Sequence, residues 1–159
     1  MAEPSSLCLI RRPVPTPNAA LPEIVLRAER LVLAKRLWRG AADDGVEFGF
    51  ELDAPLAHGD TFFESATARY VVQQQPERVL EISLALAPSA AAGIGWAIGN
   101  LHLELSAEPT RLLALDEPAV RALLDRLRVP FCPTTAIFRP GRFARGNLST
   151  HELGSSHKH

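Results

Sequence analysis

The order of hydrophobic patterns in the second half of the chain restricts its fold more than any other feature. Residues 80–138 combine two segments of helical period with four segments typical of strands. They are expected as strand 80–86, helix 88–98, strand 101–105, strand 111–115, helix 117–128 and strand 131–138. This order is that of a ferredoxin-like βαββαβ domain. We therefore expect such a domain over residues 76–145, with both helices on one face of its sheet.

The first 75 residues carry strand and turn signals instead. Apolar and polar residues alternate from Val46 to Leu52, which is the period of a strand buried on one face. Asp44-Gly45 and His58-Gly59-Asp60 are turn sequences, so His58 is interpreted as structural. Proline-rich residues 11–22 predict an irregular lead-in, and Gln73 to Pro76 predict a polar linker. The predicted fold class is α+β, with a small all-β domain over residues 1–75 before the ferredoxin-like domain.

Charge is nearly balanced overall but unevenly distributed. The net charge is −1, and 47% of the residues are hydrophobic, which is enough for a real core. Residues 1–40 carry seven Lys/Arg against three Asp/Glu, whereas residues 41–76 carry one against seven. The early cations are Arg27, Arg30, Lys35, Arg36 and Arg39. Because few aromatic residues lie between these cations, the pattern does not favour nucleic-acid binding. It favours a solvated sheet face or a surface that binds an acidic protein partner.

Several other classes of protein are disfavoured. There is no apolar run of eighteen residues, and the start of the chain lacks a basic region followed by a long apolar one. We therefore expect a soluble cytoplasmic protein that does not bind a membrane. Cys8 and Cys132 lack Cys-x-x-Cys spacing, which argues against a disulfide framework or a thiolate zinc site. The motifs Gly-x-Ser-x-Gly and His-Glu-x-x-His, and a phosphate-binding glycine loop, do not occur, so an enzyme is not expected.

His102 is the candidate metal ligand. It lies in a segment where leucines alternate with His102 and Glu104, and this pattern predicts a strand whose leucines enter the core while His102 and Glu104 face outward. An exposed histidine on a rigid strand can bind a metal, although a lone exposed histidine is more often a plain surface residue. If this strand forms the edge of the sheet, a two-fold dimer brings two copies of His102 to one metal ion.

The C-terminal segment supplies the remaining histidines. His151, His157 and His159 lie within residues 146–159, for which the composition predicts a flexible tail. The segment from Gly154 to His159 resembles a linker. If the tail is mobile, its histidines can add ligands to a site that His102 begins.

The chain resembles the UreE family of urease accessory proteins, which are nickel metallochaperones. Gly99-Asn100-Leu101-His102 is similar to the Gly-Asn-Arg-His element of that family. The segments 44–50, 58–60, 70–72 and 76–82 also resemble family segments. The resemblance implies that residues 1–75 bind partners, that residues 76–145 bind metal and dimerise, and that residues 146–159 form a histidine-containing tail. It implies Ni(II) bound by His102 of both protomers. Because imidazole nitrogen also suits Zn(II) and Cu(II), either can substitute. The implied partners are a urease accessory GTPase and the urease apoprotein complex.

Two departures from the family pattern stand out. Leu101 replaces the usual arginine, which removes a charge beside His102. The tail is short and holds three histidines, which argues against high-capacity nickel storage. The competing interpretation is a regulatory or interaction module without a specific metal, in which Arg27, Arg30 and Arg36 carry the function.

Overall fold

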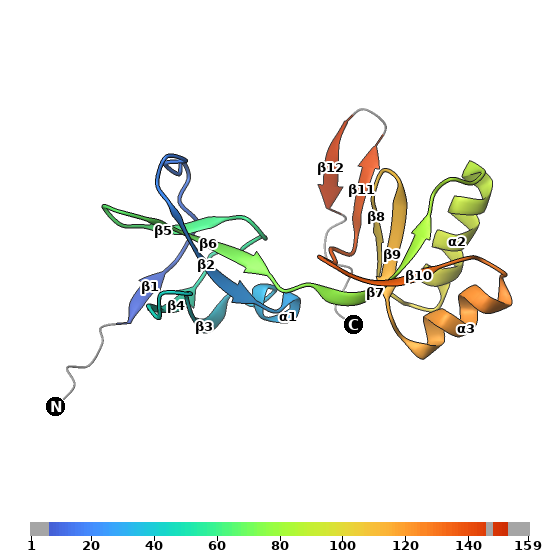
Figure 1. Cartoon of the computed structure of the whole chain (residues 1–159), viewed down its shortest axis with the longest axis horizontal. Helices are drawn as coiled ribbons and strands as arrows, with labels where there is room; N and C mark the ends of the chain where they lie inside the picture. The colour runs from blue at the N-terminus through green and yellow to red at the C-terminus, as the bar shows by residue number, and fades with distance from the viewer. Residues whose placement is uncertain (1–6, 146–147, 153–159) are drawn as a thin grey trace. The chain divides into compact units, whose positions relative to one another are not determined.

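The computed structural model describes residues 7–145 and 148–152 (Figure 1). The chain divides into two compact units, residues 1–75 and residues 76–159. No helix among the described residues has the length and apolar character that crossing a membrane requires.

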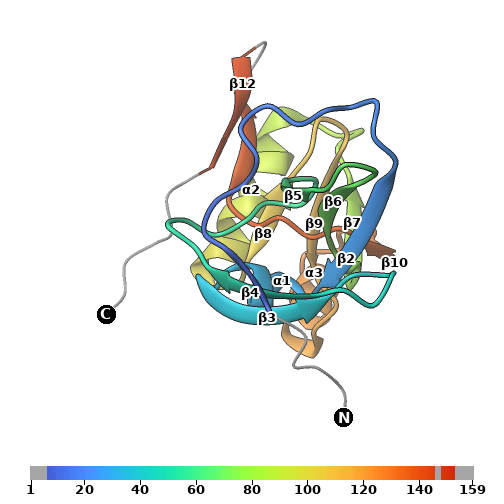
Figure 2. The same cartoon turned by 90° about the vertical axis from the view of Figure 1, so that its left-hand side faces the viewer.

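The first unit contains two three-stranded sheets. The elements are β1 (Cys8–Ile10), β2 (Glu23–Ala28), α1 (Arg30–Leu33), β3 (Leu37–Ala41), β4 (Glu47–Glu51), β5 (Thr61–Glu64) and β6 (Arg69–Gln74). One sheet has the order β1-β4-β3 and the other has the order β2-β6-β5. β1 is labelled in Figure 1, and the other strands of both sheets are labelled in Figure 2. The turns at Gly45 and Gly59 form as expected, with φ of +85° and +92°.

Aromatic side chains from both sheets form the core of this unit. Trp38 stacks on Phe50 with ring centroids 3.8 Å apart, and Phe48 packs edge-on against Phe62 and Tyr70. Aromatic pairs of this kind add stability beyond the burial of their area. The alternation therefore predicted correctly that Phe48, Phe50 and Leu52 are buried, but not Val46, which precedes β4 and is 40% exposed.

Two expectations for the first unit are wrong. The unit is not all-β, because residues 30–33 form the short helix α1. The polar run after Val72 is not a linker at Gln73 and Gln74, since both belong to β6 and Gln74 pairs with Ala28 of β2. Backbone hydrogen bonding to a neighbouring strand has overridden the polarity of the side chains.

The second unit begins with one four-stranded antiparallel sheet and two helices. Its elements are β7 (Glu77–Ser83), α2 (Pro88–Asn100), β8 (Leu105–Ala107), β9 (Arg111–Leu115), α3 (Pro118–Arg126), β10 (Cys132–Ala136), β11 (Arg142–Arg145) and β12 (Leu148–Glu152). The sheet has the order β10-β7-β9-β8. Through β10, the element order is the strand, helix, strand, strand, helix, strand order expected from the sequence.

Each face of this sheet has its own hydrophobic cluster. Alternate residues of β7 and β9 pack with the buried sides of α2 and α3, including Ile98 and Leu124, which are fully buried. On the opposite face, the fully buried Phe138 packs with Val79 and Leu113. Both helices therefore cover one face, and the segment after β10 covers part of the other.

The end of the described chain differs from the expected tail. Residues 148–152 form β12, which pairs with β11 as an antiparallel hairpin, so the segment from residue 146 is not irregular throughout. The hairpin begins beside β8, where the backbone N–H of Gly141 donates to the carbonyl of Leu105 at 2.9 Å (Figure 1). β8 is the edge strand of the sheet, as the sequence suggested, and β11 lies next to this edge.

Candidate functional site

His102 lies in the turn that ends α2, not on a strand. Its φ is +56°, in the left-handed region, so it cannot continue an extended strand. Its N–H donates to the carbonyl of Gly99 at 2.9 Å, and the N–H of Leu103 donates to the carbonyl of Ile98 at 3.3 Å. These two bonds are those of a Schellman motif, with His102 at the position that glycine usually occupies. The expected strand begins only at Leu105.

This cap holds the histidine backbone in one conformation. Leu103 packs against the core cluster that contains the buried Ile98, which is the hydrophobic contact that accompanies a Schellman motif. His102 itself is exposed. A left-handed residue other than glycine is unfavourable, and such residues persist where the surrounding structure holds them. The cap therefore exposes the imidazole to solvent on a backbone that is held in place. The predicted strand would have held it in place as well.

A shallow pocket lies beside His102. It has a volume of about 210 Å³ and is lined by His102, Leu103, Glu104, Leu115, Glu117 and Val120. The lining groups that can bind a metal ion are one imidazole and two carboxylates. The other three lining side chains are apolar. In the described part of the chain, no group of three or more His, Cys, Asp or Glu side chains is close enough to hold a metal ion.

The exposed residues of α2 and of its C-cap, Leu101, are uncharged, and His102 follows directly. Trp96 is 72% exposed and Leu101 is 43% exposed. All thirteen residues of α2 are uncharged. At Gly93 and Gly99 an added Cβ would have no atom within 4 Å, so these glycines do not serve packing inside the described chain. Helix glycines that touch nothing within their own unit leave room for the close approach of another surface.

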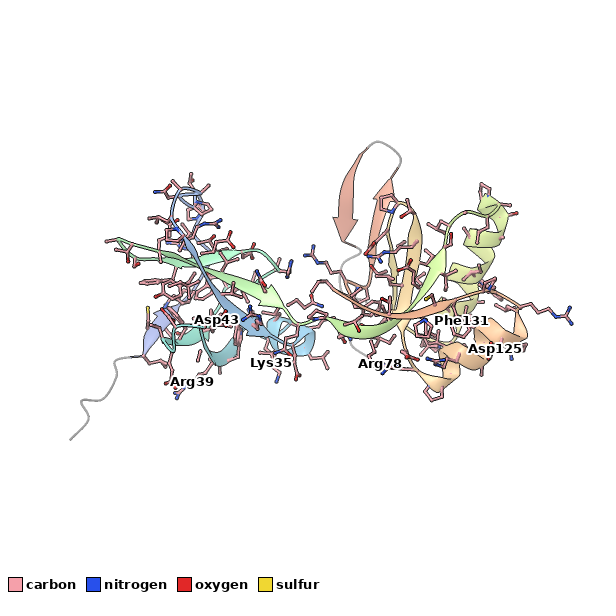
Figure 3. The ribbon with its side chains drawn as sticks, viewed as in Figure 1. Lys35, Arg39, Asp43, Arg78, Asp125 and Phe131 are labelled. Carbon is pink, nitrogen blue, oxygen red and sulfur yellow. The ribbon has the colours of Figure 1, made fainter. Side chains whose placement is uncertain are left out.

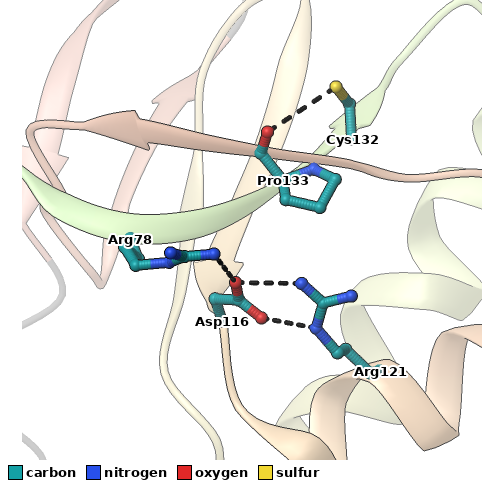
Figure 4. A network of polar contacts seen from close by, with 5 residues as sticks. All are labelled: Arg78, Asp116, Arg121, Cys132 and Pro133. Carbon is teal, nitrogen blue, oxygen red and sulfur yellow. Dashed lines mark hydrogen bonds and ion pairs between the residues drawn. The ribbon is translucent and has the colours of Figure 1, made fainter.

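An ion-paired network fixes the start of α3, which forms one wall of the pocket. The guanidinium of Arg121 contacts both oxygens of Asp116, at 2.6 and 3.0 Å, and Arg78 contacts one of them at 3.4 Å (Figure 4). The Arg121 hydrogen bonds are the main reason that the pKa of Asp116 lies below its ordinary value. Asp116 directly precedes Glu117, so the network holds the segment that carries the Glu117 carboxylate. The Cys132 thiol, also drawn in Figure 4, donates to the carbonyl of Pro133 at 3.8 Å.

The other predicted ligands are placed differently. His151 lies on β12, opposite Phe143 of β11. His157 and His159 lie outside the described residues. His58 has the structural role expected from its turn, because its Nδ1 accepts a hydrogen bond from the backbone N–H of Gln74 at 3.0 Å.

The arginines of the competing interpretation are largely engaged in contacts. Arg27 donates to both oxygens of Asp43, at 2.5 and 2.7 Å. Arg30 also has an interaction partner. Sequence reasoning had singled out His102 and Glu104, but it missed Glu117 and the exposed Trp96. An uncharged helix that carries a tryptophan was the available signal for Trp96, while Glu117 is distant in sequence and only the fold brings it to the pocket.

Comparison with known proteins identifies the family. Residues 77–159 match the model of the UreE urease accessory protein, C-terminal domain. A urease accessory protein UreE of Azorhizobium caulinodans is 31% identical over 121 residues, which cover 74% of this chain and 57% of that protein. The chain thus spans just over half the length of this relative.

A urease accessory protein UreE of Rhizobium meliloti is 26% identical over 147 residues, covering 92% of this chain and 93% of that protein. Another, from Bifidobacterium longum subsp. infantis, is 32% identical over 87 residues and covers 54% of this chain and 39% of that protein. The family model alone matches more than half of the chain. The chain therefore belongs to the UreE family of urease accessory proteins, a family of accessory chaperones and not of enzymes.

Proposed function

We propose that the protein is a nickel metallochaperone that binds one Ni(II) between two copies of His102 and delivers it for assembly of the urease active site. The observation that carries this proposal is the imidazole of His102, exposed at a rigid cap in a turn position where glycine is the usual residue. Imidazole nitrogen suits Ni(II), Cu(II) and Zn(II), so Zn(II) or Cu(II) can substitute. The choice of nickel comes from the family.

The exposed side of α2 supports a homodimer. Gly93, Trp96 and Gly99 follow one another at three-residue spacing and form an uncharged side of α2, and Leu101 is exposed next to His102. In a two-fold dimer the same patch meets itself, and residues near the axis meet their own copies. If this surface pairs with a second copy, the two imidazoles lie together and the incomplete ligand set of one chain is completed by the other. Leu101, in place of the family arginine, makes such an interface more apolar.

The C-terminal segment is proposed to supply exchangeable ligands. The β11–β12 hairpin starts beside β8, and β8 begins three residues after His102. The hydrogen bond between Gly141 and Leu105 therefore brings the C-terminal segment back to β8, the strand that follows the proposed site. His157 and His159, with His151 in a lesser role, would then fill open positions on the ion and leave them when a partner takes it. A site without thiolates suits transfer better than permanent storage.

The two units are proposed to have different functions. Residues 1–75 would bind partner proteins, namely a urease accessory GTPase and the urease apoprotein complex, while residues 76–145 hold metal and dimerise. A cytoplasmic location fits the delivery of metal to an apoprotein, and neither nucleic acid nor membrane is a proposed partner.

Nickel titration calorimetry of His102→Asn tests the proposal. Asparagine tolerates the left-handed conformation, so this variant removes the imidazole and keeps the cap. We expect the high-affinity nickel signal to disappear, while the control His58→Asn retains it. Affinity should also fall on acidification, because a protonated imidazole cannot ligate. Unchanged nickel binding in His102→Asn would reject His102 as the ligand, and no specific uptake by the wild type would favour the metal-free interaction module.

A further inference from the structure

One face of the β1-β4-β3 sheet in the first unit is exposed and has an unusual composition. Leu9 of β1, Gly49 of β4 and Arg39 of β3 lie directly opposite one another in register. Leu37 lies two residues before Arg39 and therefore points to the same face. The intervening residues, such as Phe50 and Trp38, point into the aromatic core.

Three leucines are exposed on this outer face. Leu7 is 36% exposed, Leu9 is 50% exposed and Leu37 is 76% exposed. A Cβ added at Gly49 would lie 2.7 Å from Cδ2 of Leu7, so Leu7 lies against the bare backbone at the centre of the sheet. Single exposed leucines are ordinary on a soluble protein, but several on one face indicate an interaction surface.

Cations surround the leucine with the greatest exposure. Lys35 and Arg36 precede Leu37 and Arg39 follows it, and all three are exposed; Lys35 and Arg39 are labelled in Figure 3. Within residues 7–145 and 148–152, no side-chain ion pair is found for these three cations. By contrast, Arg11 pairs with Glu51 at 3.3 Å, so the acidic residue opposite Leu37 already has a cationic partner. Apolar area therefore lies beside positive charge that has no acidic partner in the described chain.

We propose that this outer face, defined by Leu7, Leu9, Leu37, Lys35, Arg36 and Arg39, docks an acidic segment of a partner protein that carries a large apolar side chain. The inference rests on the proposed partner-binding role of residues 1–75 and adds the face and the chemistry of the partner. The exposed leucines would pack against the apolar side chain of the partner, and the three cations would form ion pairs with its carboxylates.

Two other occupants fit the face less well. In a two-fold contact between copies of this chain, the unpaired cations of one copy would approach those of the other, which is unfavourable. A nucleic acid would need exposed aromatic residues or an extended basic stripe, and this face offers leucines.

The test uses the full chain and a labelled peptide in which aspartate alternates with leucine, with a lysine-for-aspartate peptide as the charge-reversed probe. Fluorescence anisotropy should show saturable binding of the acidic peptide only, and the binding should weaken with salt. Leu37→Ser, and separately the triple variant Lys35→Glu, Arg36→Glu, Arg39→Glu, should each weaken it by about tenfold or more. Matched controls elsewhere are Leu127→Ser, at a leucine that is 44% exposed, and Arg126→Glu on α3, and both should bind as the wild type does.

Each alternative outcome has a definite meaning. Equal binding of both peptides, no saturable binding, or equal loss in the controls would overturn the proposal. If Leu37→Ser changed the sedimentation coefficient from that of a dimer to that of a monomer, the face would be an interface between copies, and the proposal would be wrong. Circular dichroism confirms that each variant folds. Nickel titration of the same variants should match the wild type, so loss of peptide binding and failure of the nickel proposal can be told apart.

Discussion

Replacing His102 by glycine should make the protein more stable while it abolishes nickel binding. A left-handed residue with a Cβ costs about 1–2 kcal/mol relative to a right-handed one. Glycine removes that cost. It also increases the conformational entropy of the unfolded chain, which lowers the free energy of unfolding by about 0.4–1 kcal/mol. Since φ at His102 is +56°, the difference predicts a net gain of about 0.5–1 kcal/mol.

His102→Ala is the matched control for this prediction. Alanine removes the imidazole but retains the Cβ and therefore the unfavourable conformation, so its free energy of unfolding should stay within about 0.5 kcal/mol of the wild type. Both variants should lose nickel binding to the same degree. Only glycine should gain stability.

Calorimetry in metal-free buffer measures the effect. A gain of this size should raise the melting temperature of the second unit by about 2–8 °C in His102→Gly. Urea unfolding followed by circular dichroism gives an independent value. If His102→Gly were no more stable than His102→Ala, the left-handed cap would not carry the assigned cost, and the argument that His102 is held there for function would fail.

Three further predictions concern packing and ionisation. Phe138→Ala should destabilise the second unit by about 3–5 kcal/mol, because a fully buried aromatic ring is lost; urea unfolding checks this. Asp116→Asn should flatten the acid limb of the stability profile, because the Arg121 hydrogen bonds lower the folded-state pKa of Asp116 below 3.8. Its stabilisation is thus complete above the unfolded-state pKa and is lost as pH falls toward the folded-state pKa, as acid titration by circular dichroism would show. The pKa of Tyr70, the only tyrosine of the sequence, lies above 10.0, first because its O–H donates to Asp44 at 2.7 Å. Its stabilising contribution is complete below the unfolded-state pKa and is lost as pH rises through the raised folded-state pKa. Asp44→Asn should lower the midpoint in an ultraviolet titration of Tyr70.

Strong periodic patterns were sufficient to predict most of the elements. The helical period around Val120 to Leu127 and the alternation in β4 each arise from one buried face, so the pattern itself carries the information. The turns at Gly45 and Gly59 were predictable because few residues other than glycine accept their φ. The order of the elements followed from these local signals.

His102 stays the predicted metal ligand, but the strand on which the prediction placed it does not form there. Leucines at 101, 103 and 105 suggested a strand, but α2 continues to Asn100 and Leu101 is its C-cap. The left-handed position after the C-cap is therefore occupied by His102, although local sequence rules favour glycine there and Gly99 was the expected end of the helix. The hairpin beside β8 and the approach of Glu117 to the pocket depend on contacts between distant segments, which periodicity does not encode.

Native mass spectrometry of the full chain with Ni(II) tests the central claim most directly. We expect one nickel ion for two chains in the wild type, with two chains remaining associated, and no retained nickel in His102→Asn. One nickel ion held by a single chain, or the same nickel-loaded species in His102→Asn, would contradict a site shared between two copies of His102.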